Sequence, residues 1–167
     1  MFSIFYNVVL FIVGLIALPK LLWDWARHRK YRKSLLERLG LRVREFSLAG
    51  KKGVVWIHTI SVGETRAVAS LFHIIRKAHP DAAILISNIT ETGHAEAKRS
   101  MPGADGYFFL PLDFSWIIRR ILKRIRPNIL ILMESDFWYH LLSEAKKSGA
   151  AIVLVNGKVS ELSLIHI

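Results

Sequence analysis

The sequence has no cysteine among its 167 residues, which excludes disulfide bonds and thiolate metal sites. Its first eighteen residues, MFSIFYNVVLFIVGLIAL, contain no charged side chain. The sequence has no glycine-rich P-loop with its lysine, no spacing of His, Asp and Glu that predicts a metal site, and no internal repeat. What is present is 52% hydrophobic residues, enough to bury a core in one domain of ordinary size with an appendage.

Basic residues are concentrated in one short segment beside the N-terminus, and this segment supplies most of the net charge of +11. Residues 20–52 carry eleven Lys and Arg against three Asp and Glu, whereas residues 53–167 have a net charge of only +3. A nucleic-acid-binding domain would interleave aromatic and basic residues on one face. The core lacks that pattern, so we expect no nucleic-acid partner and attribute the basic segment to attraction by anionic lipid.

The uncharged N-terminal stretch reaches about twenty residues with the following PKLL, near the length that a bilayer-crossing helix needs. A signal peptide would have a basic residue before the apolar run, but the first one is Lys20. Aromatic residues typical of a membrane interface follow the run: Trp23, Trp25 and Tyr31. The pattern predicts a membrane anchor over residues 1–22 and a basic juxtamembrane segment and linker over 23–52, with the rest cytoplasmic. An apolar helix buried against the protein is the alternative.

From Gly53 onward, continuous apolar runs alternate with helical patterns. Continuous runs are typical of parallel strands that are covered on both faces. The pattern predicts a Rossmann-like α/β fold, a parallel sheet with helices on both faces. The predicted strands are Val54–Ile60, Ala82–Asn88, Gly106–Leu110, Asn128–Met133 and Ala150–Val155. The predicted helices are Glu64–His79, His94–Ser100, Phe114–Arg126 and Phe137–Ser148.

Polar residues follow the carboxyl end of every predicted strand, where parallel α/β sheets bind their ligands. Two carboxylates, Glu64 and Glu134, come directly after strands and are the candidates for chemistry. The other candidate residues are predicted to bind substrate: Ser61, Gly63, Thr90, Thr92, Gly93, Asp113, Asp136, Trp138, Asn156, Lys158 and Ser160.

Several of these residues also fit structural roles. The SVGE spacing is that of a capping box, with Ser61 as N-cap and Glu64 reaching back to its N–H. The sequence TETG either starts a helix or forms an anion-binding nest. Asp113 fits the N-cap of the next helix, and His58, within an apolar run, fits a hydrogen-bonded core residue.

Five segments in this order together resemble the N-terminal half of the Kdo transferases, which attach 3-deoxy-D-manno-octulosonic acid to lipid A precursor. They are WIHTISVGE, ITETG, LPLD, ESDFW and NGKVS, and the resemblance covers about residues 1–163. It implies a GT-B-type glycosyltransferase of two Rossmann-like halves, with the acceptor bound here and CMP-Kdo bound by a second half. It also implies that Glu64 is the general base, that Glu134 is the second acidic position, and that neither a metal nor a cofactor is needed.

The resemblance places residues 53–163 in an acceptor-binding domain at the cytoplasmic face of the bacterial inner membrane. The sequence departs from the family at Tyr139, where many members have proline, and at Gly157–Lys158, where many have alanine and arginine. Residues 164–167 are unlike the family, and the donor half is absent. We therefore expect this chain to be inactive alone. The alternative is a membrane-tethered domain that binds the acceptor or lipid without catalysis.

Overall fold

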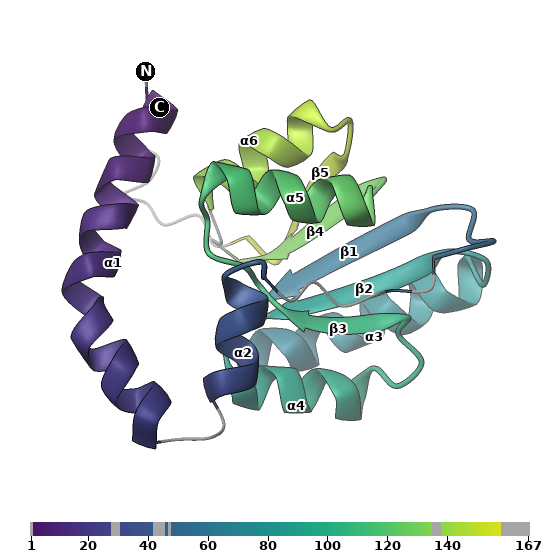
Figure 1. Ribbon diagram of the computed structural model, residues 1–167. Helices are drawn as coiled ribbons and strands as arrows, with labels where there is room; N and C mark the ends of the chain where they lie inside the picture. Colours follow the sequence, from purple (N-terminus) through teal and green to yellow (C-terminus); the bar gives the residue numbers. More distant parts are fainter. Residues whose placement is uncertain (1, 28–30, 42–45, 47, 135–137, 158–167) are drawn as a thin grey trace.

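The computed structural model describes residues 2–27, 31–41, 46, 48–134 and 138–157. Two helices come first, α1 (Phe2–Arg27) and α2 (Tyr31–Arg38). Nine alternating strands and helices follow, at the positions that the apolar periodicity predicts (Figure 1). The candidate residues Asp136, Lys158 and Ser160 and the predicted tail 164–167 lie outside the described residues.

The nine elements build one parallel sheet in the order β3-β2-β1-β4-β5, which confirms the predicted α/β fold. The strands are β1 (Val54–Thr59), β2 (Ala83–Asn88), β3 (Gly106–Phe109), β4 (Ile129–Met133) and β5 (Ala151–Val155). All six residues of β1 are buried, as are all six of β2. Burial on both faces explains why these strands are continuous apolar runs rather than alternating ones.

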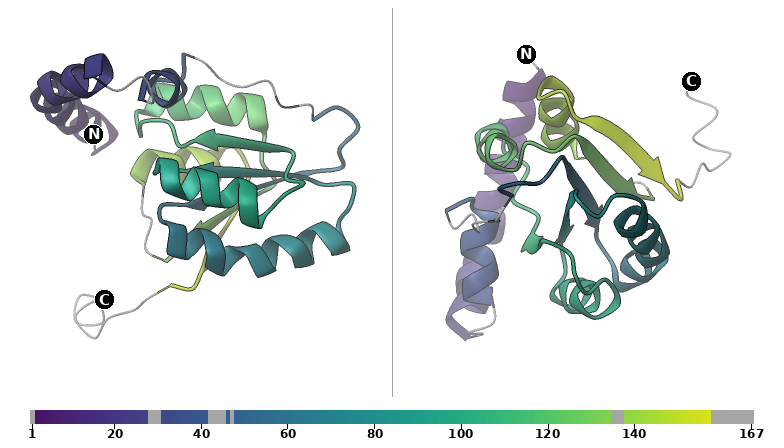
Figure 2. Two further views of the ribbon diagram at one scale, coloured as in Figure 1. Left: turned by 90° about the horizontal axis from the view of Figure 1, so that it is seen from below. Right: turned by 90° about the vertical axis from the view of Figure 1, so that its right-hand side faces the viewer.

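Two pairs of helices cover the two faces of the sheet (Figure 2). Helices α3 (Val62–Ala78) and α4 (Glu91–Ser100) lie on one face, and α5 (Ser115–Ile125) and α6 (Tyr139–Lys147) on the other. Each face of the sheet has its own hydrophobic core, and successive residues of β1 point into opposite cores. Trp56 packs with Ile118 and Leu141 on the α5–α6 side, whereas Ile57 packs on the α3–α4 side.

The chain reverses its winding direction between β1 and β4. From β1 it adds β2 and β3 on one side, and then it crosses back to place β4 and β5 on the other. In such sheets the ligand crevice opens at the carboxyl ends of the two strands where the order reverses. These ends point toward the side on which α1 and α2 stand (Figure 1). The carboxyl edge of β1 and β4 is therefore the place to look for the functional site.

Helix α1 contains the residues predicted as a membrane anchor, and it presents many apolar side chains to solvent. Ile4 is 71% exposed, Ile16 is 75% exposed and Trp23 is 64% exposed. Tyr6 and Asn7 face the domain, where Asn7 contacts Ser115 at the start of α5. Within the described part of the chain, no helix has both the length and the apolar composition required to cross a bilayer.

Candidate functional site at the carboxyl edge of the sheet

Glu64 lies in the first turn of α3, directly beyond the end of β1. Its carboxylate accepts two hydrogen bonds, from the Ile60 N–H at 2.7 Å and from the Ser61 hydroxyl at 3.0 Å. Ser61 is the N-cap of α3, as predicted, and its hydroxyl accepts the Glu64 N–H at 3.2 Å. The Ile60 N–H takes the place of the Ser61 N–H that an ordinary capping box would use. Both oxygens of the carboxylate are thus held in a fixed orientation at the edge of the sheet.

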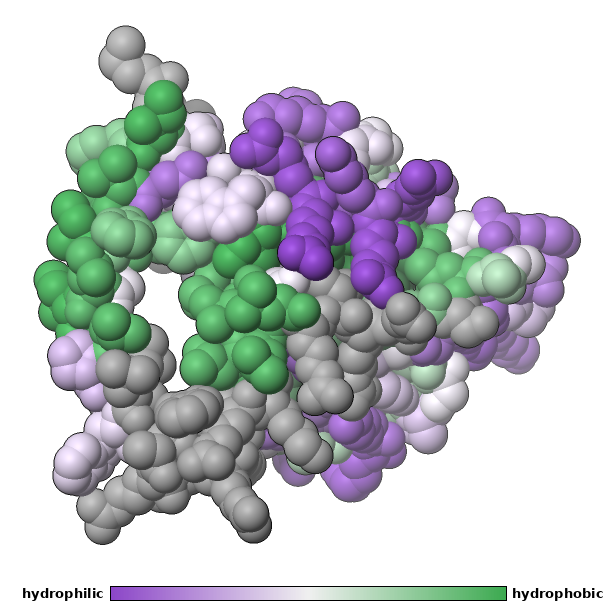
Figure 3. Space-filling view, viewed as in Figure 1, coloured by the Kyte–Doolittle hydropathy of each residue, from purple (hydrophilic) through white to green (hydrophobic). Residues whose placement is uncertain are grey.

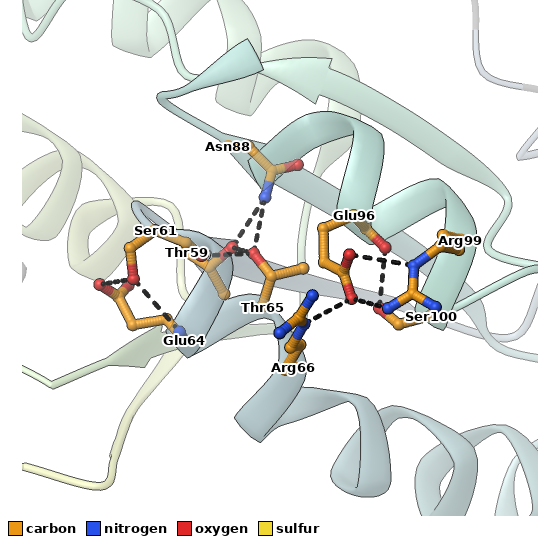
Figure 4. Close-up of polar contacts among 9 residues, drawn as sticks. All are labelled: Thr59, Ser61, Glu64, Thr65, Arg66, Asn88, Glu96, Arg99 and Ser100. Atoms are coloured by element: carbon orange, nitrogen blue, oxygen red, sulfur yellow. Dashed lines mark hydrogen bonds and ion pairs between the residues drawn. The ribbon is translucent and has the colours of Figure 1, made fainter. Parts of the chain in front are cut away.

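A buried polar network holds the start of α3 against the ends of β1 and β2 (Figure 4). The Asn88 amide donates to the Thr59 hydroxyl at 2.7 Å, and the Thr59 and Thr65 hydroxyls are 2.9 Å apart. Thr65 in turn donates to the Ser61 carbonyl at 2.7 Å. All three side chains are fully buried. These three residues were not among those predicted for the site from the sequence, although Thr59 and Asn88 end their strands.

The predicted ITETG segment forms the start of α4. Thr90 is the N-cap: its hydroxyl accepts the Gly93 N–H at 3.0 Å and donates to the Ile60 carbonyl at 3.0 Å. A Cβ at Gly93 would lie 2.9 Å from Thr90 Oγ1 and 3.3 Å from the Ile60 carbonyl oxygen. Glycine at this position therefore lets the turns after β1 and β2 meet. Thr92 is on the exposed side, with its hydroxyl 3.4 Å from that of Thr90.

Gly63 differs from Gly93 because it lies in open space. A Cβ at Gly63 would meet only Ser61 Oγ, at an ordinary 3.8 Å. Packing within the chain therefore does not require glycine in the first turn of α3. The missing side chain leaves the exposed N-terminus of α3, beside Glu64, open to approach from solvent.

Glu134 follows β4, the strand that pairs with β1. Its backbone has φ of 58°, a left-handed conformation that is uncommon for a residue other than glycine, asparagine or aspartate. The Glu134 N–H donates to the Val155 carbonyl at 2.9 Å, and Asn156 beyond β5 also has a positive φ, 56°. Unusual backbone conformations of this kind concentrate at functional sites. The turns after β4 and β5 thus continue the edge on which Glu64 lies.

Asp113 is at the same edge, but its side chain faces the protein interior. The carboxylate accepts the Leu141 N–H at 2.8 Å, the His140 N–H at 3.0 Å and the Tyr6 hydroxyl at 3.0 Å. Burial raises the pKa of Asp113 above its ordinary value, while these hydrogen bonds act in the opposite direction. Asp113 therefore caps α6, whereas the sequence pattern suggested the following helix, α5. That helix begins after Phe114 without a side-chain cap.

Trp138 is the N-cap residue of α6, and its partly buried ring packs against the core between the sheet and α5–α6. His58 is fully buried, with Nδ1 2.8 Å from the Ser87 hydroxyl, which confirms its prediction as a core residue. Burial lowers the pKa of His58 to about 4. The His58 imidazole is thus neutral at physiological pH and takes no place at the edge.

Helix α2 is a further part of this edge, and it lies in the segment that was predicted as juxtamembrane linker. Arg38 donates to the carbonyl of Ile89, the residue before the Thr90 cap, and its guanidinium lies 4.9 Å from the centre of the Phe109 ring. Glu37 accepts the Phe109 N–H at 3.3 Å. Two features of the sequence could have predicted this helix: the helical period of YRKSLLER, and the glycine that follows it, Gly40. In the structure Gly40 ends the helix with a φ of 66°.

The described residues contain no group of three or more His, Asp and Glu arranged to hold a metal ion. Two hollows, of about 540 and 530 Å³, lie at the opposite, amino-terminal edge of the sheet. The lining of the first includes three basic side chains of α5 and α6, those of Arg119, Lys123 and Lys147. The carboxyl edge thus combines an oriented carboxylate, a second acidic residue and two helix N-termini, an arrangement suited to acid–base chemistry on an anionic substrate.

The sequence matches a known protein family and several of its members. The family described as 3-deoxy-D-manno-octulosonic-acid transferase (kdotransferase) matches residues 33–166. A 3-deoxy-D-manno-octulosonic acid transferase of Chlamydia pneumoniae is 36% identical over 160 residues, which are 95% of this chain and 36% of that protein. One of Bordetella pertussis is 33% identical, over 86% of this chain and 35% of that protein.

Among solved structures, a universal stress protein in complex with cAMP aligns with a TM-score of 0.42 and 12% identity. The alignment covers 64% of this chain and 98% of that one. This likeness is too distant to bear on function. The chain spans about a third of the length of the curated relatives it matches.

Proposed function

The chain belongs to the 3-deoxy-D-manno-octulosonic-acid transferase family, and we propose that it is the acceptor-binding part of a glycosyltransferase. The proposed reaction transfers Kdo from CMP-Kdo to a lipid A precursor during lipopolysaccharide biosynthesis. One observation carries the proposal: Glu64 lies where the strand order reverses, and two donors hold its carboxylate.

In the proposed reaction an acceptor hydroxyl attacks the anomeric carbon of Kdo. The new carbon–oxygen bond forms as the bond to CMP breaks, CMP leaves with the bonding electron pair, and the hydroxyl proton passes to Glu64. Each carboxylate oxygen has two acceptor positions. The bonds from Ile60 and Ser61 take one position on each oxygen, so a position remains for the acceptor hydroxyl. A base placed in this way contributes roughly 10²- to 10⁴-fold to the rate.

Glu134 is the proposed second acidic group of the site. It follows β4, the neighbour of β1, so it and Glu64 flank the point where the strand order reverses. Its left-handed backbone, which the Val155 carbonyl and the turn after β5 support, is a local strain of the kind retained at active sites.

The N-termini of α3 and α4 are proposed to bind phosphate groups of the acceptor. A helix N-terminus attracts anions through its free N–H groups and its dipole. Both helices begin at the carboxyl edge, at Ser61 and Thr90, and open Gly63 allows close approach to the first of them. Thr92 is exposed in the first turn of α4 and could contact a phosphate there. Gly93, buried and with its N–H bonded to Thr90, stays a prediction as a substrate ligand. Asp136, Trp138, Asn156, Lys158 and Ser160 stay predictions as substrate ligands.

We propose that α1 attaches the enzyme to the cytoplasmic face of the bacterial inner membrane. Apolar residues gather along α1 at the left edge of the molecule (Figure 3). This surface stands on the same side as the carboxyl edge (Figure 1), which is where an acyl-bearing acceptor would have to reach from a bilayer. Liposome flotation tests the attachment. Glutamate at both Ile12 and Ile16, exposed on α1, should abolish flotation, whereas glutamate at Ile74, 65% exposed on α3, should not. Equal flotation of both variants would place the attachment elsewhere.

The transfer itself is tested with CMP-Kdo and lipid A precursor. An enzyme of the full family length that contains this chain should form the Kdo-bearing product, whereas residues 1–167 alone should not, because we propose that the donor is bound by a second half. If the full-length enzyme binds the acceptor but never transfers Kdo, the alternative of a membrane-tethered acceptor-binding domain without catalysis replaces the proposal. Turnover by residues 1–167 alone would overturn the division of roles between two halves.

A further inference from the structure

Helix α1 turns one stripe of residues toward the domain and the rest of its surface outward. In its first turns the partly buried residues recur at helical spacing, at positions Ser3, Tyr6, Asn7 and Leu10. The residues between them are exposed, and Ile4 for example is 71% exposed. One side of α1 is therefore covered by the domain, whereas the opposite side faces solvent.

Tyr6 and Asn7 are the polar residues at the centre of this stripe. Between Ile4 and Leu18 no other side chain of the sequence can form a hydrogen bond. A polar group in apolar surroundings needs a partner, because leaving it unpaired there costs free energy. Both residues find partners on the domain, at the starts of two different helices.

Tyr6 bonds to the carboxylate that caps α6. Its hydroxyl donates to Asp113 Oδ2 at 3.0 Å. Its ring lies 5.0 Å from that of His140 and 5.3 Å from that of Tyr139, both in the first turn of α6. Burial and the nearby Asp113 carboxylate raise the pKa of Tyr6 to about 12. The phenol thus keeps its proton, and stays a donor to Asp113, throughout the physiological pH range.

Asn7 makes a second contact, with the start of α5. Its amide nitrogen donates to the Ser115 hydroxyl at 3.2 Å, and the Ser115 N–H donates to its carbonyl oxygen at 3.4 Å. Ser115 is the first residue of α5, and Phe114 before it provides no side-chain cap. Asn7 therefore supplies an acceptor for an N–H group that has no partner within its own helix.

We propose that Tyr6 and Asn7 form a polar lock between α1 and the starts of α5 and α6, so that α1 is a fixed part of the domain rather than a flexible tether. Partners on two helices fix the rotation of α1 about its axis as well as its position. The exposed side, with Ile12 and Ile16, is then the side left for lipid.

The lock bears on function because α5 and α6 both begin at the carboxyl edge of the sheet (Figure 1). A helix that is fixed there sets the angle at which this edge meets the bilayer surface, which a tether would leave free. This part of the inference rests on the proposed attachment of α1 to a membrane and on the proposed transfer reaction.

The chain has no cysteine, so the lock can be tested by cross-linking pairs of introduced cysteines. The chain is placed in vesicles of phosphatidylethanolamine and phosphatidylglycerol, and a short bis-thiol reagent is added. Asn7→Cys with Ser115→Cys should react about tenfold faster than the matched pair Ile16→Cys with Ser115→Cys, because fixed neighbours have a high effective concentration. Equal rates for the two pairs would show that α1 moves freely and would overturn the proposal.

Tyr6→Phe, added to the first pair, removes the bond to Asp113 and keeps the ring. Cross-linking should slow about fivefold, the change in a docking equilibrium that one lost hydrogen bond produces. Tyr107→Phe is the matched control: it removes a bond to the Met101 carbonyl, 2.6 Å long, on the α3–α4 side of the sheet, and should leave the rate unchanged. An undiminished rate with Tyr6→Phe would overturn the proposal.

The orientation is tested in an enzyme of the full family length that carries Tyr6→Phe with Asn7→Leu. Its flotation should be unchanged, because the exposed apolar residues of α1 are kept. Transfer of Kdo to lipid A precursor in vesicles should fall about fivefold with the loss of docking. Transfer to the same precursor in detergent micelles, where no bilayer sets an angle, should not change.

Equal losses of transfer in vesicles and in micelles would reveal general damage to the domain and would overturn the role in orientation. If the wild type transfers no Kdo in either, the proposed function fails instead. The cross-linking rates do not depend on turnover, so they still decide whether Tyr6 and Asn7 lock α1 to the domain.

Discussion

The substitution Glu64→Gln separates the two roles that the geometry offers this residue, helix capping and general-base catalysis. Glutamine has nearly the same shape. Its carbonyl oxygen can accept the Ile60 N–H, and its amide can donate to Ser61 Oγ, which reverses the present bond. Two charge-assisted bonds become neutral ones, a loss of about 1 kcal/mol in the free energy of unfolding. The melting temperature should therefore fall by only a few degrees.

The effect on turnover should be much larger. An amide cannot take the acceptor proton, so the rate should fall by roughly 10²- to 10⁴-fold. This corresponds to about 3 to 5 kcal/mol in the activation free energy. Single-turnover transfer from labelled CMP-Kdo to lipid A precursor, with thermal melting of the same samples, measures both quantities. The expected result is an enzyme that is nearly as stable as the parent and nearly inactive.

Glu96→Gln is the matched control for this experiment. Glu96 is a buried carboxylate of α4 that lies away from Glu64, on the far side of the polar network (Figure 4). It accepts bonds from Arg99 at 2.6 Å and Arg66 at 3.0 Å, and these bonds lower its pKa to about 2. Its replacement should destabilise the fold and leave turnover intact. If Glu64→Gln retains near-normal turnover, Glu64 is only a cap and the proposed mechanism is refuted.

The remaining predictions concern the two glycines and His58. Gly93→Ala should lower the free energy of unfolding by about 1–3 kcal/mol, because its Cβ would lie 2.9 Å from Thr90 Oγ1. Gly63→Ala has room and should keep the melting temperature while raising KM for the acceptor; equal melting temperatures for the two variants would contradict the packing argument. His58 has a folded-state pKa of about 4, below its ordinary value of about 6.5, so the unfolded chain binds the proton more readily. Its contribution of roughly 3 kcal/mol is present above pH 6.5 and is lost as the pH falls toward 4. His58→Asn should flatten the dependence of the melting temperature on pH in this window, and an unchanged dependence would show that another group titrates there.

The fold was predictable because the strands of a parallel sheet that is buried on both faces are continuous apolar runs in the sequence. The run of β2, predicted as Ala82–Asn88, differs from the observed strand by one residue. The start of α4 was less accurate, with His94 predicted and Glu91 observed. Gly93 lies within the first turn of this helix, where close contact with Ile60 requires glycine. From the sequence, the same glycine looks like a turn residue outside the helix.

The long-range contacts of the site were not predictable in the same way. Asp113 was predicted as the cap of the next helix, α5. It instead caps α6, where its partner His140 is 27 residues further along the chain. Helix α2 was missed because its basic residues resemble a solvated linker. Its contacts with the edge depend on two side chains, Arg38 and Glu37, reaching backbone groups of Ile89 and Phe109. Nothing in the local pattern specifies such partners, because they are fixed only when the sheet is assembled.

Capping and catalysis by Glu64 support each other. A glutamate side chain has several rotatable bonds, and an unrestrained one at the edge of a sheet would sample many rotamers. The Ile60 N–H and the Ser61 hydroxyl select one orientation and still leave an acceptor position on each oxygen. Ile60 is in turn fixed on its other side, because its carbonyl accepts the Thr90 hydroxyl of the neighbouring turn. The contacts that identify Glu64 as a cap are therefore those that would preorganise it as a base, since catalytic efficiency depends on such fixed geometry. Ser61→Ala removes one of these contacts and keeps the carboxylate. It should accordingly reduce kcat by less than Glu64→Gln does but by more than Glu96→Gln. A kcat equal to that of the parent would show that the cap has no part in catalysis.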